Sequence, residues 1–222
     1  MAASDFPFTH DMVVVHKAFR REFGQASTLV RRVAPGDTKR AGVLHSHLGK
    51  LFDQLHHHHE AEDVELWPRL RQRATGQQEL LDRMEAQHSG IDPALARART
   101  LGGRWVATAD PMARDALADC LDELTGPLLA HLDQEEAEIL PLAQEYLTQQ
   151  EWARLSEYAV AHTPKSDLLK GIGGLLEDAT PAERDMMLGH LPAVPKLLYK
   201  AYGRRAYIKD ATAVRGVAPV GL

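Results

Sequence analysis

Residues Leu55 to Pro68 read LHHHHEAEDVELWP and place four consecutive histidines directly before a group of carboxylates. The leucines upstream recur at alternating steps of four and three, which is typical of a helix with one buried face. The same steps, continued, reach His58 and then Glu62 at positions where an apolar residue is due. Side chains four residues apart lie on the same side of a helix, so we predict that His58 and Glu62 both point into the protein.

The neighbouring histidines fall at other positions around the same helix. By the apolar pattern, His56 and His57 face solvent and His59 flanks the buried face. Two roles stay open for the remaining histidines of this region: they orient a metal ligand, or they carry protons along an entry channel. The histidines with these open roles are His45, His47 and His59.

The stretch HLDQEEAEILP, residues 131–141, repeats the design 73 residues later. It carries His131 and Glu135 at the same four-residue spacing, again after leucines at alternating steps of four and three. Two lone histidines, His16 and His88, also interrupt apolar helical patterns, and they lie 72 residues apart. Each half of this region therefore contributes one lone histidine and one His-x-x-x-Glu pair to predicted core positions.

Turn-forming residues divide the chain into amphipathic helical segments with short connections. Four such segments predict an up-down four-helix bundle, inside which the polar interruptions meet. We therefore predict an all-α protein with a bundle domain at residues 1–148 and a helical C-terminal extension at residues 149–222. The predicted helices are approximately residues 9–33, 37–73, 77–102 and 110–146 in the bundle, and 149–161, 166–177, 181–191 and 193–211 in the extension. Prolines inside these segments are expected to distort their helices, and they are Pro68, Pro93, Pro127 and Pro141.

Composition and charge narrow the class of protein. The net charge of −5 over 222 residues gives no reason to expect nucleic-acid binding. Aromatic residues make up only 6% of the chain, which favours helices over sheet. The single cysteine, Cys120, excludes an intramolecular disulfide and a thiolate metal cluster, and its leucine neighbours predict a buried thiol. No stretch has the roughly 18 apolar residues of a membrane span, and the N-terminal sequence lacks a secretory-signal pattern, so we expect a cytoplasmic protein.

The C-terminal extension has a glycine cluster and a basic end. Gly171-Ile172-Gly173-Gly174 lacks the preceding strand and the following Gly-Lys-Ser/Thr of a phosphate-binding loop. From Leu191 onward there are six Lys or Arg residues and one Asp. Such a run is either a solvated helix face or a docking surface for an acidic partner or phosphate.

Carboxylates inside a bundle are costly unless they pair or bind a metal. Two glutamates and four histidines suit two divalent cations, with the glutamates bridging them and two histidines on each. Nitrogen and oxygen ligands without sulfur suit iron, manganese or zinc, and the sequence leaves this choice open. The alternative is that these are ordinary hydrogen-bonded core residues. The repetition of the whole pattern favours a dinuclear metal site.

The motifs HHHHEAEDVELWP and HLDQEEAEILP, with His16 and His88, resemble those of the hemerythrin-like family of HHE cation-binding domains. The resemblance covers about residues 8–146, and the whole chain is similar to actinobacterial members with a C-terminal helical extension. It implies an up-down four-helix bundle with two iron ions, Fe2+ or Fe3+, with or without an oxo or hydroxo bridge. The ligands carried over by position are His16, His58, Glu62, His88, His131 and Glu135.

One departure from the oxygen-carrying hemerythrins concerns the third helix, where they have a second histidine one turn from the first. Here the candidate positions hold Met84 and Asp92. The oxygen carriers also have an Asp five residues after the fourth-helix histidine, whereas this chain has Glu135 at four. The resemblance therefore implies a more symmetric site, in which redox turnover is favoured over reversible O2 carriage.

Three functional hypotheses follow. The first is a di-iron protein that reacts with O2, peroxide or nitric oxide, as a peroxidase-like, catalase-like or nitric-oxide-consuming oxidoreductase with an unidentified electron donor. The second is a non-catalytic module that binds or senses O2, nitric oxide or iron. The third is a zinc-containing or metal-free structural bundle whose extension binds a partner.

Overall fold

The computed structural model describes residues 8–220, which form helices and connections and include no strand. The predicted all-α class is confirmed. The outer ends of the two predicted domains, residues 1–7 and 221–222, lie outside the described residues. The chain groups into two compact units. Within the described residues, unit 1 comprises Phe23–His162 with Phe8 and Thr9, and unit 2 comprises His10–Glu22 with residues 163–220.

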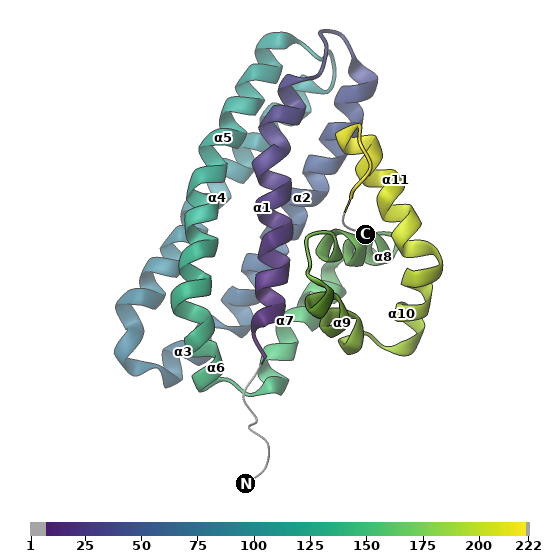
Figure 1. Ribbon diagram of the computed structural model, residues 1–222. Coiled ribbons are helices and arrows are strands. Elements are labelled where there is room, and N and C mark those ends of the chain that lie inside the picture. Colours follow the sequence, from purple (N-terminus) through teal and green to yellow (C-terminus); the bar gives the residue numbers. More distant parts are fainter. Residues whose placement is uncertain (1–7, 221–222) are drawn as a thin grey trace. The chain divides into compact units, whose positions relative to one another are not determined.

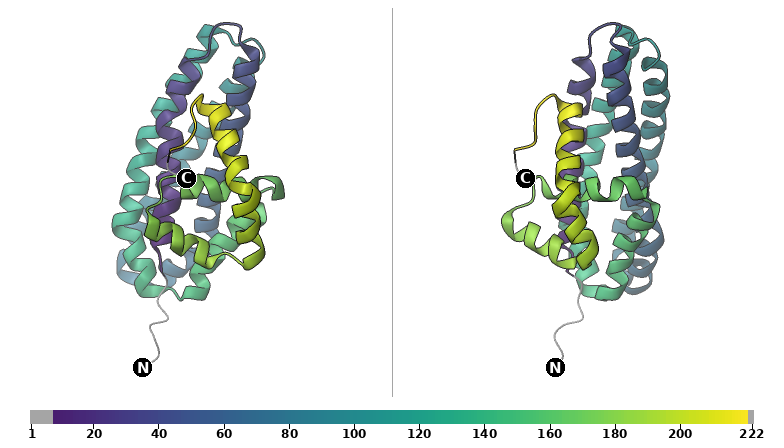
Figure 2. Two further views of the ribbon diagram at one scale, coloured as in Figure 1. Left: turned by 45° about the vertical axis from the view of Figure 1, so that its right-hand side comes forward. Right: turned by 90° about the vertical axis from the view of Figure 1, so that its right-hand side faces the viewer.

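Unit 1 is built on four long helical segments that run alongside one another (Figures 1 and 2). They are the second half of α1 (His10–Arg31), α2 (Thr38–Glu65), α4 (Gln78–Trp105) and α5 (Pro111–Gln134). Consecutive segments run in opposite directions, as the short connections require. The predicted bundle with additional C-terminal helices is thereby confirmed.

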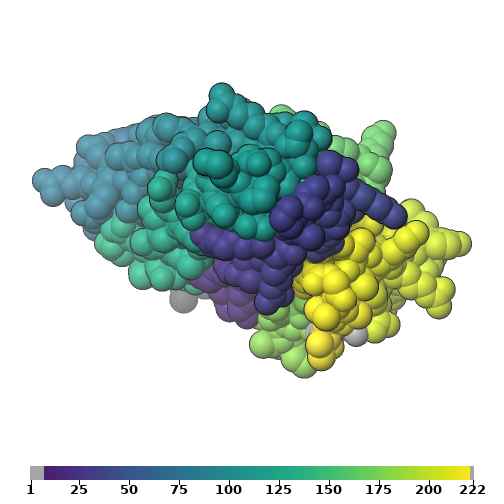
Figure 3. Space-filling view, turned by 90° about the horizontal axis from the view of Figure 1, so that it is seen from above, coloured from purple at the N-terminus to yellow at the C-terminus, as the bar shows by residue number. Residues whose placement is uncertain are grey.

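The helices begin where the sequence provides capping groups. Asp37 accepts a hydrogen bond from the Arg40 amide at 2.9 Å at the start of α2, and Asp110 accepts one from the Ala113 amide at 2.8 Å at the start of α5. Each bond satisfies an amide that the first turn leaves without a helical partner. The two connections before these helices adjoin at one end of unit 1, where Gly36 N–H donates to the Ala109 carbonyl (Figure 3).

The second and fourth predicted helices are interrupted close to their prolines. α2 ends at Glu65, and a short helix α3 (Trp67–Arg73) follows with Pro68 in its first turn. α5 passes into a π-helical turn at Glu135–Ile139, where the Leu140 amide donates to the Glu135 carbonyl. α6 (Leu140–Tyr146) then begins with Pro141 in its first turn. By contrast, α5 continues as α-helix through Pro127, and α4 does so through Pro93.

The core of unit 1 follows the predicted apolar stripes. Leu44, Leu48, Leu51 and Leu55 on α2 are each at most 3% exposed. Removing a leucine side chain from water contributes roughly 1.5–3 kcal/mol, so this stripe alone strongly favours the observed helix orientation. Cys120 is 1% exposed, which confirms the buried thiol. No helix within residues 8–220 has the length and apolar content needed to cross a membrane.

The helix α7 (Gln149–His162) packs on α2 within unit 1. Its start is fixed by Glu151, whose carboxylate accepts the Thr148 amide at 3.0 Å and pairs with Arg73 at 2.7 Å. The predicted domain boundary after residue 148 stays a prediction. Compact unit 1 includes α7 and extends through His162.

Unit 2 combines the first part of α1 with four short C-terminal helices. Its apolar cluster brings Val14 of α1 together with Leu176, Ala179 and Tyr199. The helix predicted over residues 193–211 differs from the structure in two ways. A π-helical turn (Tyr199–Gly203) divides this segment, and its last helix ends at Arg215 rather than at residue 211. The helices are α8 (Lys165–Leu176), α9 (Pro181–His190), α10 (Ala193–Leu198) and α11 (Arg204–Arg215).

Candidate metal centre

Five of the six predicted ligands lie in unit 1, and all five are buried. Glu62 and Glu135 are 0% exposed, which is the exposure expected of a leucine at such a position. The residues come from three helices and from the π-helical turn after α5. They are His58 and Glu62 on α2, His88 on α4, His131 on α5 and Glu135 in the turn.

The sixth predicted ligand, His16, lies on α1 among the residues that group with unit 2. Its side chain is buried, as the apolar pattern of α1 predicts. Its role as a ligand stays a prediction.

His58, Glu62 and Glu135 form one group of possible metal ligands. Each offers a ligand atom, and these atoms lie within 4.8 Å of one another. His58 Nε2 is 3.1 Å from Glu62 Oε1, the contact expected from their four-residue spacing on α2. Two carboxyl groups and an imidazole in the interior of a bundle form a donor set that suits a divalent cation.

A second group consists of three buried histidines, His59, His88 and His131, whose ligand atoms also lie within 4.8 Å of one another. The Nε2 atoms of His88 and His131 are 3.1 Å apart. The ring of His59 stacks on that of His88 with 4.1 Å between centroids, and it meets the ring of His131 nearly edge-on at 5.3 Å. The sequence predicts that His59 lies beside the buried face. In the structure the side chain is buried, at 3% exposure, and belongs to this group.

The carboxyl group of Glu62 connects the two groups. Its Oε1 atom is 3.1 Å from His58 Nε2, and its Oε2 atom is 3.3 Å from His88 Nε2. On the other side, Glu135 Oε2 is 3.8 Å from His131 Nε2. A glutamate whose two oxygens face two different imidazoles has the arrangement that a bridging ligand requires.

Two further side chains fix the orientation of His88 and His131. Asp63 Oδ1 accepts from Nδ1 of His88 at 2.9 Å, and it also accepts from the indole of Trp67 at 2.9 Å. Gln87 Oε1 accepts from Nδ1 of His131 at 3.0 Å. Because both oxygens act as acceptors, the Nδ1 atoms carry the protons. In a neutral imidazole with its proton on Nδ1, Nε2 is the nitrogen that presents a lone pair to a metal.

The charges in this interior shift the pKa of two groups. Burial raises the pKa of Glu62, because the ionised carboxyl loses water. Burial alone would lower the pKa of His88, but its hydrogen bonds to Asp63 and Glu62 raise that pKa to about 10. These hydrogen bonds favour the imidazolium form of His88 beside Glu62, and a bound cation would supply the positive charge in its place.

The donor set fits a metal pair. Imidazole nitrogens bind such ions at about 2.0–2.1 Å, so two of them on one ion lie about 3 Å apart, as Nε2 of His88 and Nε2 of His131 do. The carboxyl groups of Glu62 and Glu135 lie close together and are fully buried, and a bound cation would compensate their charge when both are ionised.

Other histidines of the region lie outside these two groups. His56, His57 and Glu60 form an exposed to half-buried cluster on α2, and the ring of His57 lies 5.2 Å from that of His162. Acidic surface groups of this kind are common on helices without a metal, and we assign no role to this one.

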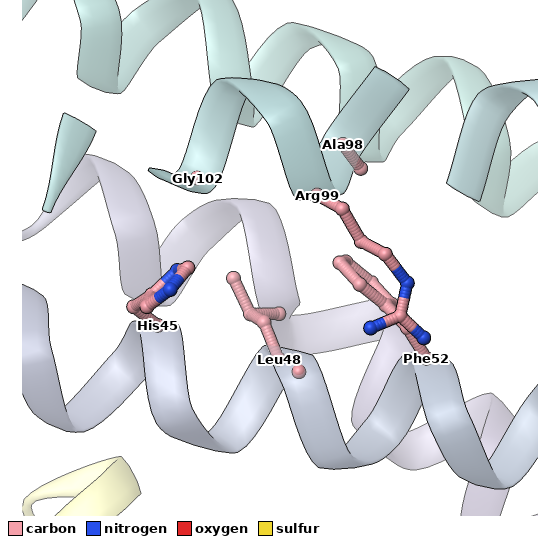
Figure 4. Close-up of a pocket in the computed structure, with 7 residues that line it drawn as sticks. His45, Leu48, Phe52, Ala98, Arg99 and Gly102 are labelled. Atoms are coloured by element: carbon pink, nitrogen blue, oxygen red, sulfur yellow. The ribbon is translucent and has the colours of Figure 1, made fainter. Parts of the chain in front are cut away.

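His45 lines a pocket of about 160 Å³ between α2 and α4 (Figure 4). Arg99 and Phe52 lie at the other end of this pocket, with the guanidinium of Arg99 5.5 Å from the Phe52 ring centre. Thirteen residues separate His45 from His58 along α2, which corresponds to about 20 Å at 1.5 Å per residue. At this distance along α2, the structure does not support a role for His45 or the nearby His47 in orienting a metal ligand or in carrying protons to the metal centre.

The sequence analysis leaves the role of His59 open and does not identify Asp63 or Gln87 as participants. A signal exists for Asp63, because His59 and Asp63 have the same four-residue spacing as His58 and Glu62. A buried helix face is more than 100° wide, so two adjacent residues can both lie on it. Gln87 had no comparable signal, since its contact with His131 joins α4 to α5.

Comparison with known proteins agrees with this geometry. Residues 8–143 match the family model described as the hemerythrin HHE cation-binding domain. No curated protein and no solved structure matches the chain. The similarity to actinobacterial members in particular stays a prediction. The matched region includes both histidine groups and extends over more than half of the 222 residues, and the chain therefore belongs to the hemerythrin HHE cation-binding domain family.

Proposed function

We propose that this protein holds two iron ions in the interior of unit 1 and uses them to react with O2, peroxide or nitric oxide. The observation that carries the proposal is the position of Glu62. It is fully buried, and its two carboxyl oxygens face His58 on one side and His88 on the other. A carboxylate placed in this way serves two cations better than one. Membership of a cation-binding family supports the same conclusion.

In this proposal His16 is the sixth ligand. Support for His16 comes from its place on the apolar face of α1 and from its burial. The sequence repeat also supports it, because His16 and His88 are separated by almost the same interval as the two His-x-x-x-Glu pairs. The proposed ligands are His16, His58, Glu62, His88, His131 and Glu135.

The protein's own residues have distinct tasks in this centre. Glu62 and Glu135 provide the negative charge that balances the cations. Asp63 and Gln87 hold His88 and His131 in the tautomer that leaves Nε2 available. These ligand side chains are buried, and exclusion of water from them strengthens the electrostatic interactions in the centre. A bound iron pair would supply electrons and open coordination positions for a small oxidant.

We infer redox turnover as the main activity, with an electron donor still to be identified, no nucleic-acid partner and a cytoplasmic location. The second candidate is a non-catalytic sensor of O2, nitric oxide or iron. One observation favours it: the residue after His16 on α1, Lys17, forms a 2.7 Å ion pair with Glu183 on α9. A shift of His16 would therefore also move Lys17, the next residue of α1, and so affect its ion pair with Glu183 in unit 2.

The test compares the full chain purified in air with the same chain after removal of metal by a chelator. The proposal expects near-ultraviolet absorption from an iron pair, and faster loss of added peroxide or nitric oxide in the metal-containing sample than in the stripped one. Binding without repeated consumption identifies the sensor function. Absence of both iron and any reaction contradicts the proposal.

A further inference from the structure

Two consecutive residues of α2, His58 and His59, are both buried, at 9% and 3% exposure. Adjacent residues on a helix point about 100° apart, so they serve different neighbours. His58 lies with Glu62 and Glu135, whereas His59 lies with His88 and His131. The two neighbouring positions thus contribute one imidazole to each of the two ligand groups.

The three imidazole rings of the group around His59 pack against one another. Its ring lies 4.1 Å from that of His88 and 5.3 Å from that of His131, and the latter two rings are 4.7 Å apart. All three residues are at most 3% exposed and come from three different helices, α2, α4 and α5. The ligand atoms of the three imidazoles lie within 4.8 Å of one another, and imidazole nitrogens are common ligands of divalent cations.

The helix α4 supplies only one histidine to this group. One turn before His88 is Met84, a buried apolar residue, and one turn after it is Asp92, which is exposed. Neither can provide a further nitrogen ligand. The ring of His59 on α2 is the imidazole that packs directly on that of His88.

We propose that His59 is a seventh ligand, and that it binds one of the two ions together with His88 and His131. This inference rests on the proposed dinuclear centre and makes its two positions unequal. One ion then has three imidazole ligands, the other has two, and the carboxyl groups of Glu62 and Glu135 bridge the pair in the proposed centre. The additional imidazole gives the two ions different coordination environments.

A different role for His59 is purely mechanical, because a ring stacked on His88 holds that side chain in place. The variant His59→Phe separates the two roles. It keeps a flat ring for stacking and removes both nitrogen donors. The matched control is His56→Phe, which makes the same change at an exposed position of the same helix.

The experiment adds Fe2+ without oxygen to the metal-free full-length chain, removes loosely held iron with a mild chelator, and measures the iron retained per chain. The proposal expects two ions in the unchanged protein and in His56→Phe, and one in His59→Phe. Binding of the second ion to His59→Phe should weaken by about 100-fold or more, since even residues that only orient a ligand contribute 10–100-fold. Circular dichroism checks that the variants remain helical.

The outcomes separate the inference from the proposed function. If the unchanged chain retains no pair of ions, the proposed dinuclear function fails. If it retains two and His59→Phe also retains two with equal affinity, only the role of His59 as a ligand is overturned. If His59→Phe does not fold, an anomalous-scattering map of the metal-loaded unchanged protein decides instead. It should place an ion about 2.1 Å from a ring nitrogen of His59, and an ion more than 3 Å away rejects the inference.

Discussion

The Nε2 atoms of His88 and His131 lie 3.1 Å apart, although the two residues are 43 positions apart in the chain and belong to different helices. The other ring nitrogen, Nδ1, donates a hydrogen bond in both residues: His88 donates to Asp63, and His131 donates to Gln87. The pair is therefore already oriented for a shared ion before any ion binds. Such preorganisation reduces the conformational entropy that metal binding would otherwise cost.

The first prediction concerns Asp63, which is partly exposed but directs His88. Asp63→Asn keeps the shape and an oxygen acceptor but removes the negative charge that favours the proton on Nδ1. We expect metal affinity to fall by 10–100-fold. Competition with a coloured chelator measures the change, and Asp92→Asn, at an exposed site on α4, serves as the control. Equal affinities for the two variants would show that Asp63 does not orient the ligand.

The second prediction concerns the stability that the metal adds. A ligand that binds only the folded state stabilises it by about 4 kcal/mol when present at 1,000 times its dissociation constant. We expect the unchanged protein to gain about this much with Fe2+ in the absence of oxygen, and Glu62→Gln to gain less than half. Calorimetry of both proteins with and without iron measures the gain. Glu60→Gln, at a partly exposed position of α2, should behave like the unchanged protein.

The third prediction explains part of the glycine cluster in α8. A Cβ atom at Gly173 would lie 2.6 Å from Cβ and Cγ of Tyr207 on α11, so the two helices could not keep their close approach. We expect Gly173→Ala to destabilise unit 2 by about 1–3 kcal/mol. Gly171 has no atom within 4 Å of such a Cβ. Gly171→Ala should therefore stabilise the helix by up to about 1 kcal/mol, and chemical denaturation that gave the same sign for both would refute this explanation.

The fourth prediction concerns pH. Burial alone would raise the pKa of Glu183, but Lys17, the Thr180 amide and His10 together lower it to about 2. A lowered pKa in the folded state stabilises the protein above the unfolded pKa of about 4.5, and this contribution disappears as pH falls toward 2. Lys17 is about one-third exposed, so solvent screens part of the interaction.

The variant Glu183→Gln isolates this charge, because glutamine also serves in the capping box that Glu183 forms with Thr180. We expect the unchanged protein to be more stable by about 2 kcal/mol at pH 7 and by almost nothing at pH 2. Urea denaturation at both values measures the difference, with Asp185→Asn at an exposed position of α9 as control. A difference that persisted unchanged at pH 2 would mean that the charge is not its source.

The fold could be predicted from sequence because its signals are local. The spacing of Leu44, Leu48, Leu51 and Leu55 identifies the buried face of α2, and Asp37 and Asp110 mark helix starts by capping chemistry that depends on neighbouring residues alone. The same spacing predicted that His58 and Glu62 would be buried, and both are.

The remainder depends on contacts between distant segments. The apolar pattern places His59 at the edge of the buried face because the pattern defines a line along α2, whereas His88 on α4 and His131 on α5 also cover the position of His59. The π-helical turn at Glu135 was expected only as an unspecified distortion near Pro141, since its five-residue hydrogen bond is not encoded in any short motif. The packing of α7 on α2 likewise follows from tertiary contacts.

The central claim is that one chain holds two iron ions in the interior that contains Glu62. Iron and protein measured on the same sample of full-length chain, purified without added metal, test it most directly. The account predicts two iron atoms per chain, and close to none after Glu62→Gln. A single ion per chain, zinc in place of iron, or an unchanged iron content in Glu62→Gln would contradict it.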